Sequence, residues 1–313
     1  MASSFLAVQF EFTHAIGPHA GRYIVAHPSS VDSTGAALRS DALTRRQQLS
    51  GQTMQKGTAD VLAISVDVAP ARIPKLRRKA KEAEVDSGPA EVPLLLATFI
   101  RGTRPLDRKV ADAELLELSV DEDAQQAWVA EGLLVLNRAI RAYRAGSRDP
   151  YVREVAQRDS RTTRIGYGTT ESLPNGKFTR AAVLPLPLGL KASREERLAP
   201  SETTANVLAG RASVLEGEDL LLRAYTDLDH GRTRAAALQV RAAVHLLELE
   251  LRDLDGGNIG VDFDELANDT DRIVAAIAGG PLEHEQVVEV EAIVERIEHA
   301  IELWRFTPRL ETS

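Results

Sequence analysis

Arginine is the residue whose number and spacing most suggest a binding function in this sequence. Eight arginines fall within residues 138–164, together with only three acidic residues. Some of them are spaced to share one face of a helix, and a guanidinium group binds phosphates and carboxylates through paired hydrogen bonds. We therefore predict a binding surface made of Arg141, Arg144, Arg148, Arg161, Arg164 and Tyr167.

Two interpretations of this arginine-rich stretch stay open. Its cations could pair with acidic residues of the C-terminal region in an internal interface, or they could contact an anion or a nucleic acid. No known nucleic-acid-binding motif accompanies the arginines. We favour the internal interface because it is the commoner arrangement of clustered charges.

Glycines flank Tyr167 on both sides, a pattern that could mark a phosphate-binding loop. Such a loop needs a following helix whose N-terminus holds the phosphate, but the turn signal Asn175-Gly176 follows instead. We therefore expect the glycines to allow a bulge or close packing of the backbone. If the protein is an enzyme, the candidate lining residues of its cleft are Arg164, Tyr167 and Glu171.

Metal and cofactor chemistry find little support in the sequence. His14, His19 and His27 lie close together, but zinc needs three or four converging ligands and scattered histidines are far commoner. The acidic stretch 253–265 lacks the glycine and the glutamate that a calcium loop requires at its sixth and twelfth positions. The sequence has no cysteine and no motif typical of nucleotide binding, of hydrolases or of metalloproteases. We therefore predict no catalytic residue, no metal and no cofactor.

Charge is unevenly distributed along the 313 residues, whose net charge is −8. Residues 1–110 hold 15 basic and 10 acidic side chains, whereas residues 201–313 hold 10 basic and 23 acidic ones. An acidic C-terminal third repels nucleic acid and anionic membranes. The N-terminus lacks the basic start of a signal peptide, and no stretch is long and apolar enough to span a bilayer. We therefore expect a cytoplasmic protein that does not bind membranes.

A β-rich N-terminal portion is predicted over residues 1–108. Larger apolar residues alternate with small or polar ones from Leu6 to Phe12, which predicts a half-buried strand. Three further runs of β-branched and apolar residues predict strands at 22–27, 61–68 and 92–100. The polar stretches between them, 28–60 and 72–89, are expected to be long loops.

A central portion follows over residues 109–190. Apolar residues recur every three or four positions over 122–145, which predicts an amphipathic helix that ends near Gly146. The pair Asp149-Pro150 favours a short helix immediately after it.

A β-hairpin is predicted over residues 163–184. Asn175-Gly176 is the signal for a type I′ turn, since both central residues of that turn need positive φ. Prolines then mark a linker that runs to about residue 200.

An acidic bundle of helices is predicted over residues 201–313. Helices are expected at residues 203–229, 233–252, 262–278 and 283–306. The last one carries a seam of apolar residues at steps of three and four, suited to packing on another helix: Val287, Val290, Val294, Ile297, Ile301 and Trp304. We predict that this seam binds a partner or a second copy of the chain, unless it forms the core of the bundle.

Two resemblances to known families follow from these patterns. Gly231, Ala236, Val240 and Ala243 are spaced as in a tetratricopeptide repeat, which the chain resembles over about one repeat. Any antiparallel helix pair with small residues at its crossing has the same spacing. Separately, the segments DPYVREV, RIGYGT and NGKF resemble a family of uncharacterised bacterial proteins over roughly residues 90–250. That resemblance implies no activity and brings no catalytic residues.

The sequence thus predicts an α+β fold with a small β-rich N-terminal portion and a mainly helical C-terminal bundle. The function it favours is that of a non-enzymatic cytoplasmic adaptor or scaffold, which binds a protein partner or itself through the bundle. One alternative is an enzyme with a site between the β portion and the bundle. The other is nucleic-acid binding through residues 138–164.

Overall fold

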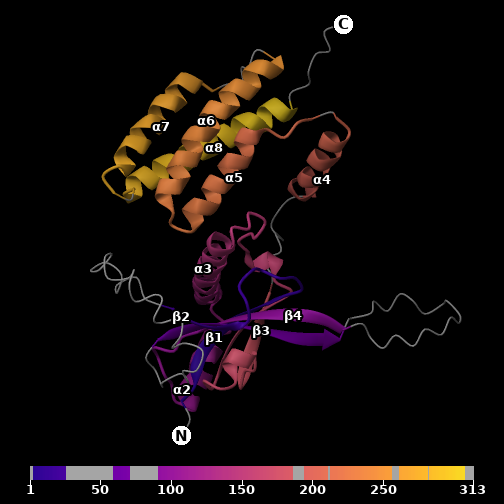
Figure 1. Ribbon diagram of the computed structural model, residues 1–313, viewed down its shortest axis with the longest axis vertical. Coiled ribbons are helices and arrows are strands. Elements are labelled where there is room, and N and C mark those ends of the chain that lie inside the picture. Colours follow the sequence, from indigo (N-terminus) through magenta and orange to yellow (C-terminus); the bar gives the residue numbers. More distant parts are fainter. Residues whose placement is uncertain are drawn as a thin grey trace, which may run out of the picture. The chain divides into compact units, whose positions relative to one another are not determined.

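The computed structural model describes residues 3–25, 59–70, 91–185, 194–210, 212–255, 261–280 and 282–306. The chain forms two compact units, unit 1 (residues 1–190) and unit 2 (residues 191–313). Unit 1 contains a β-sheet, and the described part of unit 2 is helical (Figure 1). The predicted α+β fold is therefore confirmed, and the predicted portions 1–108 and 109–190 both fall within unit 1.

Unit 1 is built on a six-stranded antiparallel sheet with the order β2-β3-β4-β1-β5-β6. Its strands are β1 (Phe5–Phe12), β2 (Gly21–Val25), β3 (Asp60–Pro70), β4 (Glu91–Ile100), β5 (Thr162–Gly168) and β6 (Arg180–Leu184). The four strands predicted in the first hundred residues are confirmed. β1 pairs with both β4 and β5, so a strand from the N-terminus lies beside one from the distant hairpin.

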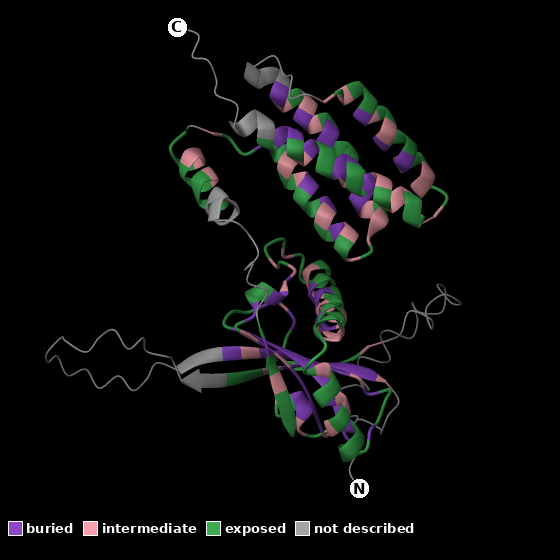
Figure 2. Cartoon of the chain, turned by 180° about the vertical axis from the view of Figure 1, so that it is seen from behind, coloured by how far each residue is buried: buried purple, intermediate pink, exposed green. Residues whose placement is uncertain are grey.

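The central strand β1 is buried along its whole length, so the expectation of a half-buried strand is wrong. One face, which carries Val8 and Phe10, belongs to the main core of unit 1. On the other face, Ala7 packs in a smaller core with Leu173, from the segment that joins β5 to β6. Because both faces are covered, even Gln9 is buried. Figure 2 shows the central part of the sheet in purple, the colour of buried residues.

Two helices, α2 (Arg108–Leu118) and α3 (Glu122–Ser147), contribute the residues that cover the main-core face of the sheet. The start of α3 is fixed by Asp121, whose side chain accepts a hydrogen bond from the Ala124 N–H at 3.0 Å. The helix predicted over residues 122–145 is therefore confirmed.

α3 ends at Ser147, one residue after the predicted stop at Gly146. The next residue, Arg148, adopts the left-handed conformation with φ of 57°. The short helix expected after it is wrong: residues 149–156 are irregular, and a short 3-10 turn, η2 (Gln157–Asp159), follows. The Asp149 side chain accepts a hydrogen bond from the Tyr151 N–H at 2.9 Å, which forms a local turn in place of a helix start.

The predicted hairpin is confirmed by the pairing of β5 with β6. Its predicted type I′ turn is wrong, because residues 169–179 join the strands and contain a 3-10 turn, η3 (Leu173–Asn175). Only Gly176 of the Asn-Gly pair has positive φ, at 72°. This longer connection supplies Leu173 and Phe178 to the smaller core of the sheet.

Unit 2 consists of α4 (Arg194–Leu208), α5 (Glu216–Asp229), α6 (Thr233–Asp255), α7 (Phe263–Ile277) and α8 (His284–Phe306). The helix predicted over 203–229 is two helices, α4 and α5, and Gly210 between them has φ of 71°. α6 contacts α5, α7 and α8. None of the helices in the described residues is long and apolar enough to span a membrane.

Candidate functional site

Two of the predicted binding arginines contact an acidic residue of their own unit. Arg141 and Arg144 on α3 lie 3.8 Å and 3.5 Å from the carboxylate of Glu154, whose side chain is 10% exposed. Arg144 also donates to the Val152 carbonyl at 3.5 Å. These arginines therefore hold the irregular segment after α3 against the helix.

A residue that the sequence reasoning missed completes this attachment. The Asn137 amide donates to the Val155 carbonyl at 2.9 Å and accepts from the Val155 N–H at 2.8 Å. Asn137 is buried on α3 near the apolar Leu136 and Ile140. A polar amide among core positions of an amphipathic helix is the signal that could have identified it, since a buried amide needs partners.

Arg164 also contacts residues of its own unit, on the neighbouring strand β1. Its guanidinium pairs with Glu11 and donates to the Gln9 side chain at 3.3 Å, and Gln9 in turn donates to Thr98 at 3.1 Å. The Glu11 side chain is 11% exposed and that of Arg164 31%. This cluster satisfies polar groups on three neighbouring strands, so Arg164 is committed to the fold.

Tyr167 lies on the opposite face of β5 from Arg164, because the two are three residues apart in a strand. Its buried hydroxyl donates to Asp112 on α2 at 2.7 Å, and Arg180 donates to the same carboxylate at 3.2 Å. Burial and the bond to Asp112 raise the pKa of Tyr167, and the same bond lowers the pKa of Asp112. The Tyr167 hydroxyl therefore holds its proton more tightly than a free tyrosine does.

The residues proposed for an enzyme cleft are therefore not brought together. Arg164 and Tyr167 occupy opposite faces of the sheet, and Glu171 is exposed in the connection between β5 and β6. The glycine beside Tyr167 serves packing, as expected: a side chain at Gly166 would collide with the Arg180 carbonyl and with Phe178.

The predicted arginine surface is likewise dispersed. Arg148 is exposed in its left-handed conformation at the end of α3, and Arg161 is exposed before β5. The ion pairs described for Arg141, Arg144 and Arg164 are all made with acidic residues of unit 1. No single phosphate-binding surface results from these contacts.

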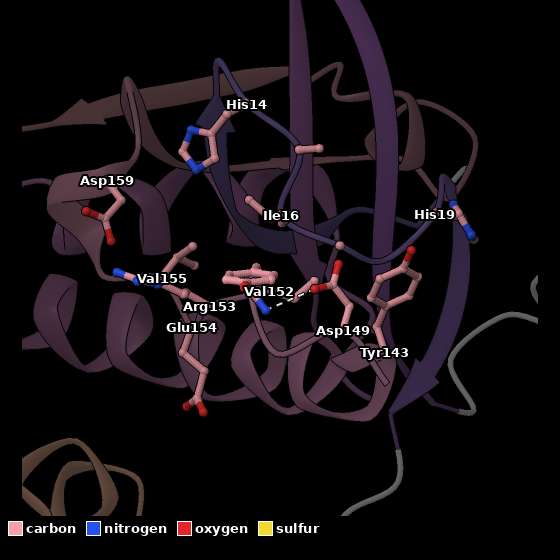
Figure 3. Close-up of a pocket in the computed structure, with 13 residues that line it drawn as sticks. His14, Ile16, His19, Tyr143, Asp149, Val152, Arg153, Glu154, Val155 and Asp159 are labelled. Atoms are coloured by element: carbon pink, nitrogen blue, oxygen red, sulfur yellow. Dashed lines mark hydrogen bonds between the residues drawn. The ribbon is translucent and has the colours of Figure 1, made fainter. Parts of the chain in front are cut away.

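Two of the three histidines singled out from the sequence line a pocket in unit 1. His14 and His19 lie in the loop between β1 and β2 and line an open pocket of about 850 Å³, together with Asp149 and neighbouring residues (Figure 3). His27 lies outside the described residues. Within the described part of the chain, no group of three or more histidine or acidic side chains could hold a metal ion.

The predicted partner seam is internal to unit 2. Val290, Val294, Ile297 and Ile301 are all at most 2% exposed and belong to the bundle core, and Val287 packs against it. Trp304 falls on α8, but its side chain lies outside the described residues. A partner of unit 2 must therefore contact other side chains.

A different set of α8 residues forms a charged surface beside the core. Four glutamates recur at steps of four, three and four, which places them on one face of the helix. We call them the glutamate stripe: Glu291, Glu295, Glu298 and Glu302. Glu298 is half-buried and the other three are exposed.

The electrostatics of the stripe show that it adjoins α5. Burial raises the pKa of Glu298, a hydrogen bond with Tyr225 lowers it, and the like charges of Glu218 on α5 and of Glu302 and Glu295 raise it. Burial and the charge of Glu298 also raise the pKa of Tyr225 on α5. The carboxylates are thus crowded along the line where α5 and α8 meet.

Two arginines among the described side chains of unit 2 form ion pairs outside the stripe. Arg296, on the same helix as the stripe, lies 3.0 Å from Glu265 on α7. Arg272 on α7 pairs with Asp269 and with Glu289, which is outside the stripe. Among the described side chains, no cation forms an ion pair with the four stripe glutamates.

Comparison with known proteins identifies no relative: no family model matches the chain, and neither does any curated protein or solved structure. The resemblances to a tetratricopeptide repeat and to an uncharacterised bacterial family stay predictions. Ala236, Val240 and Ala243 are buried, as any antiparallel helix pair with a close crossing requires.

Proposed function

We propose that the protein is a non-enzymatic cytoplasmic adaptor whose glutamate stripe binds a basic segment of a partner protein. The observation that carries this proposal is the crowding of four carboxylates along α8 without a counter-charge among the described side chains. Burial, and to a smaller extent the neighbouring like charges, raise the pKa of Glu298. Like charges at helical spacing destabilise a helix, so their presence on one face favours a surface that is neutralised by a partner.

A basic protein segment fits this surface better than the other candidate ligands. Lysine and arginine side chains would place their cations against the four carboxylates and their hydrocarbon stems against Tyr225. Nucleic acids and anionic membranes would be repelled. A second copy of the stripe would also be repelled, which argues against a symmetric contact between two stripes.

The arrangement of unit 1 supports a role without catalysis. The arginines Arg141, Arg144 and Arg164 are engaged with Glu154 and Glu11. The Tyr167 hydroxyl is committed to Asp112. Arg164 and Tyr167, two of the three candidate residues for an enzyme cleft, therefore act as structural contacts. The adaptor is the function that the described charges favour.

The test is affinity purification of the tagged full chain from its own host, with nuclease treatment and with two charge variants. The stripe variant changes all four stripe glutamates to glutamine. A matched control neutralises four exposed acidic residues of unit 2 outside the stripe: Asp229→Asn, Asp264→Asn, Glu283→Gln and Glu285→Gln.

We expect one basic protein to co-purify in stoichiometric amount with the wild-type chain and the control variant, but not with the stripe variant. Nuclease should not release it. Equal recovery with all three forms would contradict a role for the stripe, and loss on nuclease treatment would favour nucleic-acid binding.

A further inference from the structure

The open pocket of unit 1 is formed by two segments that are distant in the sequence. One is the loop between β1 and β2, and the other is the irregular segment after α3. Tyr143, from the last turns of α3, lines the pocket between them (Figure 3). Its volume of about 850 Å³ falls in the range of small-ligand sites.

The floor of the pocket is apolar and held in place. Ile16 and Val155 are 3% and 8% exposed, and Val152 lies beside them. Val155 is fixed by its two hydrogen bonds with Asn137, and Val152 by the bond from Arg144. Because α3 anchors this segment, the pocket is formed before any ligand arrives.

Four aromatic side chains also line the pocket: His14, His19, Tyr143 and Tyr151. His19 packs edge-on against Tyr143, with ring centroids 5.3 Å apart. His14 packs in the same manner against Phe12. Tyr151, the residue that follows Pro150, is 84% exposed and also lines the pocket. An exposed tyrosine at the edge of an apolar floor offers its ring face to a ligand.

The charge at the pocket is negative. Asp149 and Asp159 line it, and Arg153 is the basic residue that lines it. The Glu154 carboxylate points away from Ile16 and His14 in Figure 3, toward the arginines of α3. One oxygen of Asp149 accepts the Tyr151 N–H at 2.9 Å. Figure 3 draws this bond as a dashed line, and Asp149 and Tyr143 both line the pocket.

We propose that this pocket binds an organic cation with an apolar body, its ammonium or guanidinium group at Asp149. The apolar body would cover Ile16 and Val155, and the rings of Tyr143 and Tyr151 would flank the cation, since aromatic faces attract cations. Either a free amine or a basic side chain of a peptide carries this chemistry.

The test is titration of the isotope-labelled full chain, followed by NMR, with three probes. Phenethylamine carries an ammonium group on an aromatic body, and 2-phenylethanol is its neutral counterpart. N-acetyl-lysine methylamide presents the ammonium group as a peptide would. We expect at least one ammonium probe to bind about tenfold more tightly than the alcohol, with shifts at Tyr151 and its neighbours.

Asp149→Asn keeps the oxygen that accepts the Tyr151 N–H but removes the charge, so it should fold and lose about tenfold in affinity for the ammonium probe. The matched control is Asp229→Asn, on α5 of unit 2, which should bind as the wild type does. The stripe variant should also bind the probes normally, so failure of the proposed adaptor function would leave this result unaffected.

Preference for phenethylamine would identify a free aromatic amine as the ligand class, and preference for the lysine analogue a peptide side chain. The proposal is overturned if no ammonium probe binds, if the alcohol binds equally well, or if Asp149→Asn leaves the affinity unchanged.

Discussion

Arg164 and Glu11 form an ion pair on strands that are adjacent in the sheet but distant in the sequence. The Glu11 side chain is 11% exposed, so removing its partner leaves a nearly buried carboxylate without compensation. We expect Arg164→Met to lower the free energy of unfolding of unit 1 by about 2–4 kcal/mol; about a third of the guanidinium is exposed, which limits the loss.

Urea unfolding measures this loss through the fluorescence of Trp128 on α3 of unit 1, in a Trp304→Phe background. Arg161→Met is the matched control, because Arg161 is exposed and only its backbone N–H contacts Glu11. It should change stability by less than about 0.5 kcal/mol. An Arg164 variant as stable as this control would contradict the structural role of the pair.

Arg148 adopts a backbone conformation that favours glycine, with φ of 57° at the end of α3. We expect Arg148→Gly to raise the stability of unit 1 by about 0.5–1 kcal/mol, because glycine has no Cβ to collide in the left-handed region. In Arg138→Gly, within the same helix, glycine should instead cost about 1 kcal/mol. Urea unfolding followed by Trp128 fluorescence measures both changes in stability. Equal changes in the free energy of unfolding for the two variants would contradict the assignment of strain to Arg148.

At the scale of the helix, the glutamate stripe predicts an unusual dependence of stability on pH. Burial and neighbouring carboxylates raise the pKa of Glu298 above its ordinary value of 4.5. Folded unit 2 therefore retains this proton at a pH where the unfolded chain has lost it. The resulting stabilisation is fully present below the unfolded pKa and is lost as pH rises through the folded pKa.

Glutamine cannot ionise, so Glu298→Gln should remove the decrease in stability that occurs as Glu298 loses its proton. We expect the free energy of unfolding of unit 2 to rise by about 0.5 kcal/mol at pH 7 and to change little near pH 4. Hydrogen exchange of the core helix α6 measures the change. The exposed Glu285, in the first turn of α8, is the matched position, and its change to glutamine should not stabilise the unit. A Glu298 variant that is less stable at neutral pH would contradict the crowding of charges.

Elements with a strong local pattern could be predicted from the sequence. The 3-4 spacing along α3 and α8 and the apolar runs of the sheet identify their structure because it depends on neighbours in the chain. The burial of β1 could not be predicted this way, since Leu173 covers its second face from far along the chain. The Asn-Gly turn failed for a similar reason: packing of residues 169–179 on the sheet overrides local turn preference.

The candidate site depended even more on contacts that the sequence does not show. Arginine content predicts a binding surface around residues 138–164, but the ion pairs with Glu11 and Glu154 determine the role of Arg141, Arg144 and Arg164. The seam of α8 was identified correctly as a packing surface, whereas its occupant is the unit's own core. The glutamate stripe and the buried apolar seam lie on the same helix, α8. The packing of α8 in the folded bundle determines which of these residues are exposed.

At the scale of the whole molecule, the two units have separate hydrophobic cores. Ile297 is fully buried in the core of unit 2. Ile297→Asp should therefore unfold unit 2, since a charge buried in an apolar core is not tolerated, and leave unit 1 folded. Hydrogen exchange should show loss of protection in α6 and α8, while the Trp128 transition is unchanged.

Val288→Asp on the same helix is the control, because Val288 is 48% exposed and its change should leave both units intact. A loss of structure in unit 1 upon Ile297→Asp would contradict the independence of the two cores. So would an Ile297→Asp variant that keeps unit 2 folded.

The central claim is that the glutamate stripe binds a basic protein segment. It is tested most directly by fluorescence polarisation of a short labelled peptide of lysine, arginine and alanine, titrated with the full chain at physiological salt. We predict that the stripe variant binds at least about tenfold more weakly than the wild type, while the control variant, with the same change in net charge, stays within about twofold. Equal weakening in both variants would show that net charge alone attracts the peptide and would contradict the account.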